Sequence, residues 1–352
     1  MERTLTAWPE WLAKLDPEMG TILASLDRHR DWLAGLCAES HVYKRLVLAQ
    51  VRQFEELGQK SGAYKQYVDG KRANFDILQK MKVPQALLRA MTFNVSQRHH
   101  TLEAYRYAKT VTCQKLMEEI PLTMGSGALF AGFAAMKTLF ENLGDMTRLI
   151  NALSEATPGG DAHMTGERYD DILNKELASG IDWVKISKID LRQVDDLRSV
   201  SSAPDSKRDD ERMALKAVAS LGKRLKSVPA AYAVLNEFGS PRVGTLWLVY
   251  EDSQSMQDGH KTHWNRHKLG PGFPRIMVEQ MKPVIVQLFA VLNDAVELLK
   301  VLDKELMDLD AKIAGVTRDE IRTWLWKFPD IFDKHEDCPC GSDKRVKYCC
   351  GQ

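Results

Sequence analysis

The chain has 352 residues, of which 44% are hydrophobic and 28% charged, and its formal net charge is +1 at pH 7. This length allows a sizeable buried core in one large domain or two, so a small metal module cannot be the whole protein. The balanced charge excludes a global electrostatic drive toward nucleic acid or anionic lipid, and a polyanion site would need a local basic patch. The most apolar stretch, residues 128–140, is shorter than a bilayer span and contains Lys137. We therefore expect a cytoplasmic protein without a membrane span.

The first predicted region is residues 1–120. Apolar residues recur there at three- and four-residue spacing, which is typical of amphipathic helices. The helices are expected to break near residues 58–62, at Gly70 and at Val83–Pro84.

The second predicted region, residues 121–316, is a helical core domain. Pro121 and the turn at Gly125–Gly127 introduce a helix expected from about residue 128 to residue 156. Its apolar residues fall on one broad face, which predicts a helix packed in a core. They are Leu129, Phe130, Phe133, Met136, Phe140, Leu143, Met146, Leu149 and Ile150.

Later parts of this region are less regular. The polar, breaker-rich segments 157–166 and 201–210 are predicted loops. The apolar run 243–250 is the best strand candidate, although a buried helix would fit it equally well. A long amphipathic helix is expected from Pro283 to Ala314, ending at Gly315.

A linker helix is predicted within residues 317–334. The pattern from Thr317 to Glu320 is that of a capping box, which would open a helix through Trp324 and Trp326.

Four of the six cysteines lie within thirteen positions at the C-terminal end, in the segment 335–352. Disulfides are rare in a reducing cytosol, so a tight group of four indicates a metal site. Zinc prefers four soft ligands in a tetrahedron. We therefore predict one structural Zn²⁺ ion, held by Cys338, Cys340, Cys349 and Cys350. Together with the helical body, this predicts an all-α protein, mainly a helical bundle, with a small C-terminal zinc-binding knuckle.

The segment CPCGSDKRVKYCCG at residues 338–351 resembles the SEC-C motif, which is found at the C-terminus of the SecA translocation ATPase and in many other bacterial proteins. The family pattern is close to CPCGSGKKYKKCCG, and none of the differing positions is a ligand. The resemblance implies a recruitment role, through docking to a chaperone, to the ribosome or to an anionic lipid surface. A passive stabilising cap is the alternative.

The densest histidine group is His260, His263 and His267. Spacings of three and four would place them on one helix face, where they could bind a metal or take part in acid–base chemistry. Neighbouring glycines and Pro271 favour instead an exposed polar loop. If the body is an enzyme, these histidines with Glu237 predict a nuclease or phosphodiesterase.

The run YAVLNEFGSPRVG, residues 232–244, resembles the signature of a helical bacterial family related to HEPN domains. The helix expected at 128–156 would match that family's preceding core helix. The arginine–histidine spacing of HEPN ribonucleases does not occur at any arginine of the chain.

These features favour an interaction protein over an enzyme. We expect a bacterial zinc-binding adaptor whose tail recruits a protein, ribosome or nucleic-acid partner to a helical body, with a role in stress or phage defence as one expectation. The alternative is a HEPN-like or metal-assisted nuclease that uses the histidines at 260–267. The sequence predicts no particular oligomeric state.

Overall fold

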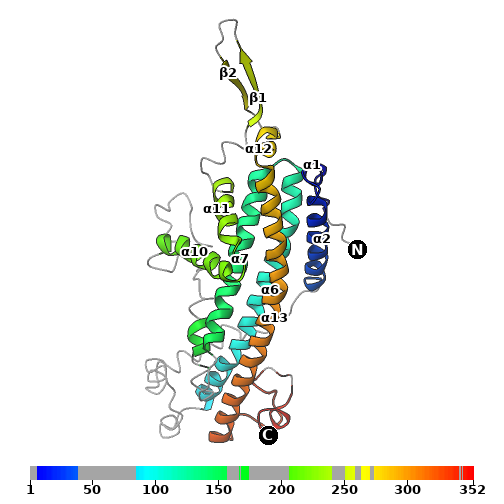
Figure 1. The fold of residues 1–352 in the computed structure, drawn as a ribbon. Coiled ribbons are helices and arrows are strands. Elements are labelled where there is room, and N and C mark those ends of the chain that lie inside the picture. The colour runs from blue at the N-terminus through cyan, green and yellow to red at the C-terminus, as the bar shows by residue number, and fades with distance from the viewer. Residues whose placement is uncertain are drawn as a thin grey trace, which may run out of the picture. The chain divides into compact units, whose positions relative to one another are not determined.

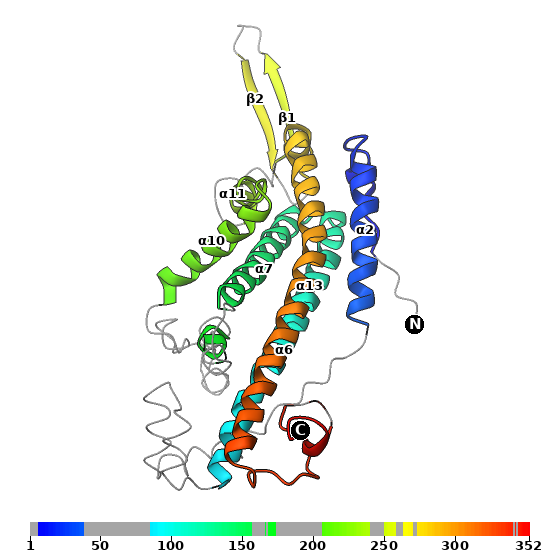
Figure 2. The same ribbon diagram turned by 60° about the horizontal axis from the view of Figure 1, so that its bottom comes forward.

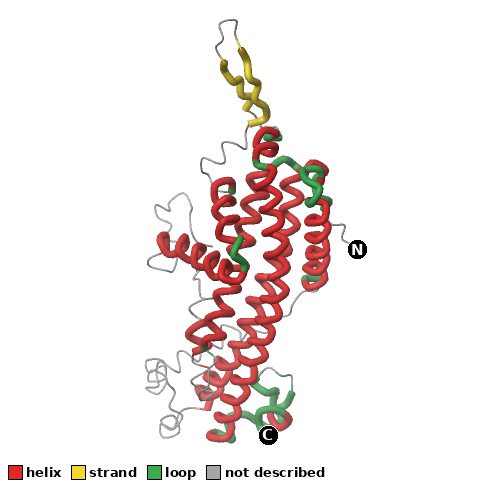
Figure 3. Tube along the Cα trace, viewed as in Figure 1, coloured by secondary structure: helices red, strands yellow, loops and turns green. Residues whose placement is uncertain are grey.

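The body of the chain is built from helices, as the sequence predicts (Figures 1 and 3). A computed structural model describes residues 6–38, 85–156, 166, 168–173, 206–239, 250–257, 263–269, 273–340, 342 and 344–352. The helices are α1 (Glu10–Ala13), α2 (Met19–Leu36), α6 (Gln85–Gly125), α7 (Leu129–Glu155), α10 (Ser206–Arg224), α11 (Val228–Phe238), α12 (Arg275–Gln280) and α13 (Lys282–Lys327). Within the described residues, no helix is both long and apolar enough to cross a membrane.

The chain forms two compact units, and each unit collects three separate stretches of the sequence. Unit 1 contains residues 1–40, 107–148 and 205–303, and unit 2 contains residues 41–106, 149–204 and 304–352. The long helices α6, α7 and α13 each contribute residues to both units. The two units are defined by which helices pack together. Their borders therefore do not coincide with changes in amino-acid composition along the sequence.

Helix α7 supplies much of the core of unit 1. Its predicted apolar face is buried from Phe133 to Met146. Phe130 is the one predicted residue of this face that is exposed, with 43% of its surface accessible. The helix begins after a turn in which Gly127 has φ +80°, a conformation that favours glycine. The glycine turn and the apolar spacing thus predicted the start of α7 and its buried face, whereas the expected break at Pro121 is wrong, because Pro121 lies inside α6.

Helix α2 packs against the part of α13 that belongs to unit 1, and the two helices lie side by side in Figures 1 and 2. Trp8, just before α1, meets Phe289 of α13 edge to face at 5.8 Å between ring centroids. Its indole N–H donates to the Asp27 carboxylate of α2 at 2.8 Å. The neighbouring His29 has Nε2 3.5 Å from the Glu297 carboxylate of α13. Apolar and polar contacts together fix the N-terminal segment of unit 1.

Helix α10 crosses α7 at Gly144, where the two backbones approach closely. A Cβ atom at Gly144 would lie 2.4 Å from the carbonyl oxygen of Ala217. Only glycine fits at this crossing, because the neighbouring atoms belong to a helix backbone that cannot turn aside.

Helix α13 corrects the expectation of two separate helices near Gly315. The helix is continuous from Lys282 to Lys327, and Gly315 lies inside it. Thr317 and Glu320 do not cap a new helix, because both are buried and the Glu320 carboxylate is bonded to Arg98 of α6. A capping-box pattern predicts a helix start only when its side chains are free to reach the backbone.

Arg98 is the centre of a buried ionic cluster in unit 2. Its Nε and Nη2 donate to the two oxygens of Asp170 at 2.5 and 2.6 Å, and its Nη1 donates to Glu320. A Cβ atom at Gly166 would clash with Arg98 Nη1 and with both Glu320 oxygens, so glycine makes room for the cluster. The cluster ties α6, the helical residues 168–173 and the end of α13 together.

One further expectation is corrected in residues 201–257, and a second is not tested. The predicted loop at 201–210 is helical from Ser206 onward, because no breaker follows Pro204. The expected strand at 243–250 lies outside the described residues except for Tyr250, where β1 (Tyr250–Gln257) begins. This strand pairs antiparallel with β2 (His263–Leu269), and the hairpin extends away from α12 in Figure 2.

Candidate metal centre

The C-terminal tail folds back beside the end of α13 (Figure 2). The helix ends near Phe328, whose N–H donates to the Trp324 carbonyl at 2.8 Å, and Pro329 follows. Ile331 and Phe332 are buried, which fixes the direction in which the chain leaves the helix. The tail therefore begins from an anchored point in unit 2.

A short antiparallel contact brings the two cysteine pairs together. The Cys338 N–H donates to the Lys344 carbonyl at 2.7 Å, and the Val346 N–H donates to the Glu336 carbonyl at 2.9 Å. The 3₁₀ helix η3 (Val346–Tyr348) then turns the chain so that the second pair follows at once. Val346 is buried and accepts a hydrogen bond from the Gly351 N–H at 2.9 Å.

Four sulfur atoms converge inside this fold, one each from Cys338, Cys340, Cys349 and Cys350. All four lie within 4.8 Å of one another. The Sγ atoms of Cys340 and Cys349 are 3.4 Å apart, and those of Cys349 and Cys350 are 3.9 Å apart. A tetrahedral zinc site with metal–sulfur bonds near 2.3 Å requires sulfur atoms about 3.8 Å apart. The arrangement therefore fits a metal ion of that size.

Three of the thiols are linked by hydrogen bonds. Bonds from Cys338 and Cys350 lower the pKa of the Cys340 thiol, because they stabilise its thiolate form. The same hydrogen bonds raise the pKa of Cys338 to about 11 and raise the pKa of Cys350 as well, because each donates its proton to Cys340. A divalent ion would replace these protons and compensate the negative charge of the thiolates.

The donor set suits a structural metal. Three of the sulfurs belong to buried residues, and Cys349 is half-buried. Four protein ligands complete a tetrahedron and leave no open coordination position for a substrate. The cysteines can thus hold a metal ion and stabilise a tail that has only one short regular element of its own.

The residues between the two cysteine pairs differ in their surroundings. Ser342 places its hydroxyl oxygen 3.0 Å from Cys349 Sγ, a contact that the sequence analysis missed. Gly341 and Asp343 lie outside the described residues. Lys344 and Arg345 are exposed, and Lys347 places its ammonium 4.6 Å from the centre of the exposed Tyr348 ring.

The histidine candidates lie on the hairpin, so the expectation of a shared helix face is wrong. His263 and His267 belong to β2, where they pair with Gln257 and Ser253, and His260 lies outside the described residues. Residues four apart in a strand are separated by about 13 Å, roughly twice their separation in a helix. This distance is too long for His263 and His267 to share one small metal ion. Glu237 lies near the end of α11 and is exposed.

The segment that resembles the HEPN-related signature begins on α11. The Tyr232 hydroxyl donates to the Glu141 carboxylate of α7 at 2.6 Å, and the Lys137 ammonium is 3.8 Å from the same carboxylate. These contacts link α11 to α7 within unit 1, and the resemblance itself stays a prediction. Residues 240–244 of the signature lie outside the described residues.

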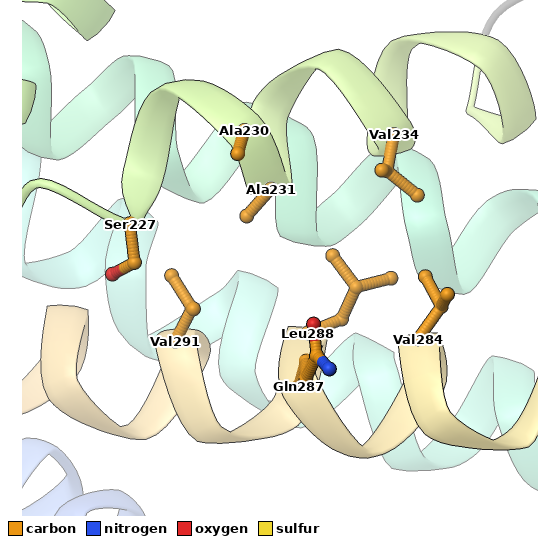
Figure 4. Close-up of a pocket in the computed structure, with 8 residues that line it drawn as sticks. All are labelled: Ser227, Ala230, Ala231, Val234, Val284, Gln287, Leu288 and Val291. Carbon is orange, nitrogen blue, oxygen red and sulfur yellow. The ribbon is translucent and has the colours of Figure 1, made fainter.

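A groove lies between α11 and α13 in unit 1 (Figure 4). It has a volume of about 170 Å³, and each helix lines it with residues at positions i, i+3, i+4 and i+7. None of the lining residues is ionisable, so the groove offers no acid–base group. The residues are Ser227, Ala230, Ala231, Val234, Val284, Gln287, Leu288 and Val291.

Comparisons with known proteins add no relative to this picture. No family model, no curated protein and no solved structure matches the chain. Its function must therefore be argued from the site itself.

Proposed function

We propose that the chain is a zinc-binding interaction protein of bacterial type, whose C-terminal module recruits a protein partner to the helical body. The observation that carries the proposal is the convergence of four sulfurs within 4.8 Å. A coordination sphere completed by the protein favours a structural role for the metal over catalysis. The proposed assignment to the SEC-C group rests on the spacing and the intervening residues of the motif.

The outward surface of the module supports a recruitment role over a passive cap. Tyr348 is 59% exposed although it adjoins two metal-ligand positions, and Lys344 and Arg345 are exposed beside it. At the end of α13, Trp326 is 80% exposed while Trp324 is buried. Exposed tyrosine, tryptophan and arginine are the residue types that most often dominate binding energy at protein interfaces. A cap that only stabilised the tail would have no need to expose them.

The charge of the module favours a protein over a nucleic acid as the partner. Zinc with four thiolates carries two negative charges, and the segment 334–352 also holds three acidic residues, Glu336, Asp337 and Asp343. Its four basic residues are Lys334, Lys344, Arg345 and Lys347. No positive excess remains to attract a phosphate backbone. If the partner is the ribosome, the module would then bind one of its proteins and not its RNA. A role in stress or phage defence stays a prediction.

Affinity capture with the full-length protein tests the proposal. The wild-type chain is expected to retain one partner that the Tyr348→Ala variant retains at least tenfold less well, while both chains keep their zinc. Met307→Ala is the matched control, because Met307 is also exposed on unit 2 but lies outside the module. Equal capture by Tyr348→Ala and wild type would contradict recruitment through this surface.

The role of the metal in recruitment needs a second variant. Cys349→Ser removes one ligand and is expected to lose both zinc and the partner. If Cys349→Ser loses zinc but still captures the same partner in full, the metal is a passive cap and the recruitment proposal is wrong.

A further inference from the structure

The four cysteines differ in their access to solvent, and this difference has chemical consequences for the tail. Cys338, Cys340 and Cys350 are buried, whereas Cys349 is half-buried. The Cys349 sulfur lies 3.4 Å from that of Cys340 and 3.9 Å from that of Cys350. A small oxidant that reaches the cluster meets Cys349 first.

The geometry favours one disulfide over the alternative. A disulfide bond is about 2.0 Å long, so the sulfurs of Cys340 and Cys349 need to move about 1.4 Å closer. Cys349 and Cys350 are adjacent in sequence, and their sulfurs start farther apart. A bond between neighbouring residues would also distort the backbone that connects them. A Cys349 sulfur that has been oxidised first would therefore be joined to Cys340 rather than to Cys350.

The other two cysteines of the chain, Cys37 and Cys113, are expected to react with an oxidant more slowly than Cys349. Cys113 is fully buried, and burial raises the pKa of its thiol to about 12, although the Asn142 side chain donates to its sulfur at 2.9 Å. An inaccessible thiol of this kind reacts slowly with oxidants. Cys37 is half-buried and lies at the end of α2, in unit 1. Only the tail offers several sulfurs close together within the described residues.

We propose that the tail is a redox switch, in which a hydroperoxide joins Cys340 to Cys349 and thereby releases the metal and the partner. This inference rests on the proposed function. In the first step the Cys349 thiolate attacks the terminal peroxide oxygen, the O–O bond breaks, and hydroxide leaves from hydrogen peroxide, or the alkoxide from an organic hydroperoxide, so that Cys349 becomes a sulfenic acid. In the second step the Cys340 thiolate attacks the Cys349 sulfur, the S–S bond forms, and hydroxide leaves. Two thiolates lose two electrons in total, and one hydroperoxide gains them.

Loss of these two ligands would undo the fold of the tail. Cys338 and Cys350 alone cannot complete a tetrahedral site, so the metal would dissociate. The metal supplies folding energy to this segment, and without it Val346 would lose its buried position. The exposed face that carries Tyr348 would no longer be held in one arrangement. Reduction by a thiol in the presence of zinc would restore it.

The test exposes the zinc-loaded full-length protein to one equivalent of hydrogen peroxide and follows zinc release with a chromogenic chelator. Release of nearly all zinc is expected, together with one new disulfide. Trypsin cuts after Lys344, Arg345 and Lys347, between the two cysteine pairs. A bond from Cys340 to Cys349 therefore links two tryptic peptides, and fragmentation at Pro339 separates Cys338 from Cys340.

Two variants make the outcome decisive. Cys349→His keeps four ligands of types that zinc accepts but cannot form the bridge, so its zinc should be released at least tenfold more slowly. Cys37→Ser should behave as wild type. Retention of zinc after peroxide treatment, a Cys349–Cys350 bond, or equal release from Cys349→His would overturn the switch. A purified protein without zinc would instead contradict the proposed function itself.

Discussion

Arg98 illustrates how a single residue can hold distant segments together. Its guanidinium is bonded to two carboxylates, those of Asp170 and Glu320, in an interior where its side chain is only 3% exposed. Burial opposes its charge, but the hydrogen bonds to Asp170 and the negative charge of Glu320 outweigh burial and raise its pKa further above the ordinary value. The arginine therefore stays charged at every pH at which the protein folds.

Replacing Arg98 by alanine should be strongly destabilising. The change leaves the buried Glu320 carboxylate and the part-exposed Asp170 carboxylate without their cation, and removing one partner of a buried ion pair typically costs about 3–5 kcal/mol. Urea unfolding of Arg98→Ala against wild type measures the loss. Arg318→Ala is a suitable control, because Arg318 is exposed on the same unit and should change the stability by less than about 0.5 kcal/mol. Equal stability of the two variants would contradict the role of the cluster.

Asp145 predicts a pH dependence of stability. Burial alone would raise the pKa of its carboxyl, but Lys109 at 2.8 Å and Arg148 at 2.9 Å lower it overall. An aspartate with a lowered pKa stabilises the folded state above its unfolded pKa of about 4, and this contribution is lost as the pH falls through the folded pKa. Asp145→Asn should thus be less stable than wild type by about 1 kcal/mol at pH 7. Thermal unfolding at pH 7 and below pH 3 checks this, since the difference should vanish in acid.

Individual helices show where sequence patterns succeed and where they fail. The apolar face and the starting turn of α7 were predicted, because spacing and breaker residues act locally. The break at Gly315 was wrong, because packing against α6 through Glu320 keeps α13 helical beyond that glycine. The hairpin was missed for a related reason: β2 is stabilised by pairing with β1, which the histidine spacing alone does not reveal.

Two glycines in helices should respond in opposite ways to alanine. At Gly144 the added Cβ would lie 2.4 Å from a backbone oxygen of α10, so Gly144→Ala should destabilise by at least about 2 kcal/mol. At Gly315 no atom lies within 4 Å of the added Cβ. Gly315→Ala should therefore stabilise by about 0.5–1 kcal/mol, because alanine favours a helix interior. Chemical unfolding of both variants tests this, and a loss of stability at Gly315 would show that the helix is not continuous there.

At the scale of the whole molecule, the cluster of four cysteines in the tail is the part that the sequence predicted best. Four cysteines at fixed spacing define the ligand set locally, and the structure brings their sulfurs together. The ionic cluster at Arg98 was not foreseen, because its members are 72 and 222 positions apart and no local pattern connects them. The two units were missed for the same reason, since each assembles stretches that are distant in sequence.

Chelation of the metal should unfold the C-terminal tail and leave the helical body folded. The tail contributes only one three-residue 3₁₀ helix, so a strong zinc chelator should leave the helical circular dichroism signal unchanged. Trypsin should then cut faster after Lys344, Arg345 and Lys347, because the loops that carry them depend on the metal for their fold. Global unfolding on chelation would contradict a tail that folds as a separate module.

Metal content is the most direct measure of the central claim, that four thiolates of the tail hold one zinc ion. Elemental analysis of the purified chain should find about one zinc per molecule. The double variant Cys349→Ser/Cys350→Ser should contain none, and Cys37→Ser should contain as much as wild type. A chain that neither contains zinc nor takes it up with all its thiols reduced, or a double variant that keeps its zinc, would contradict the account.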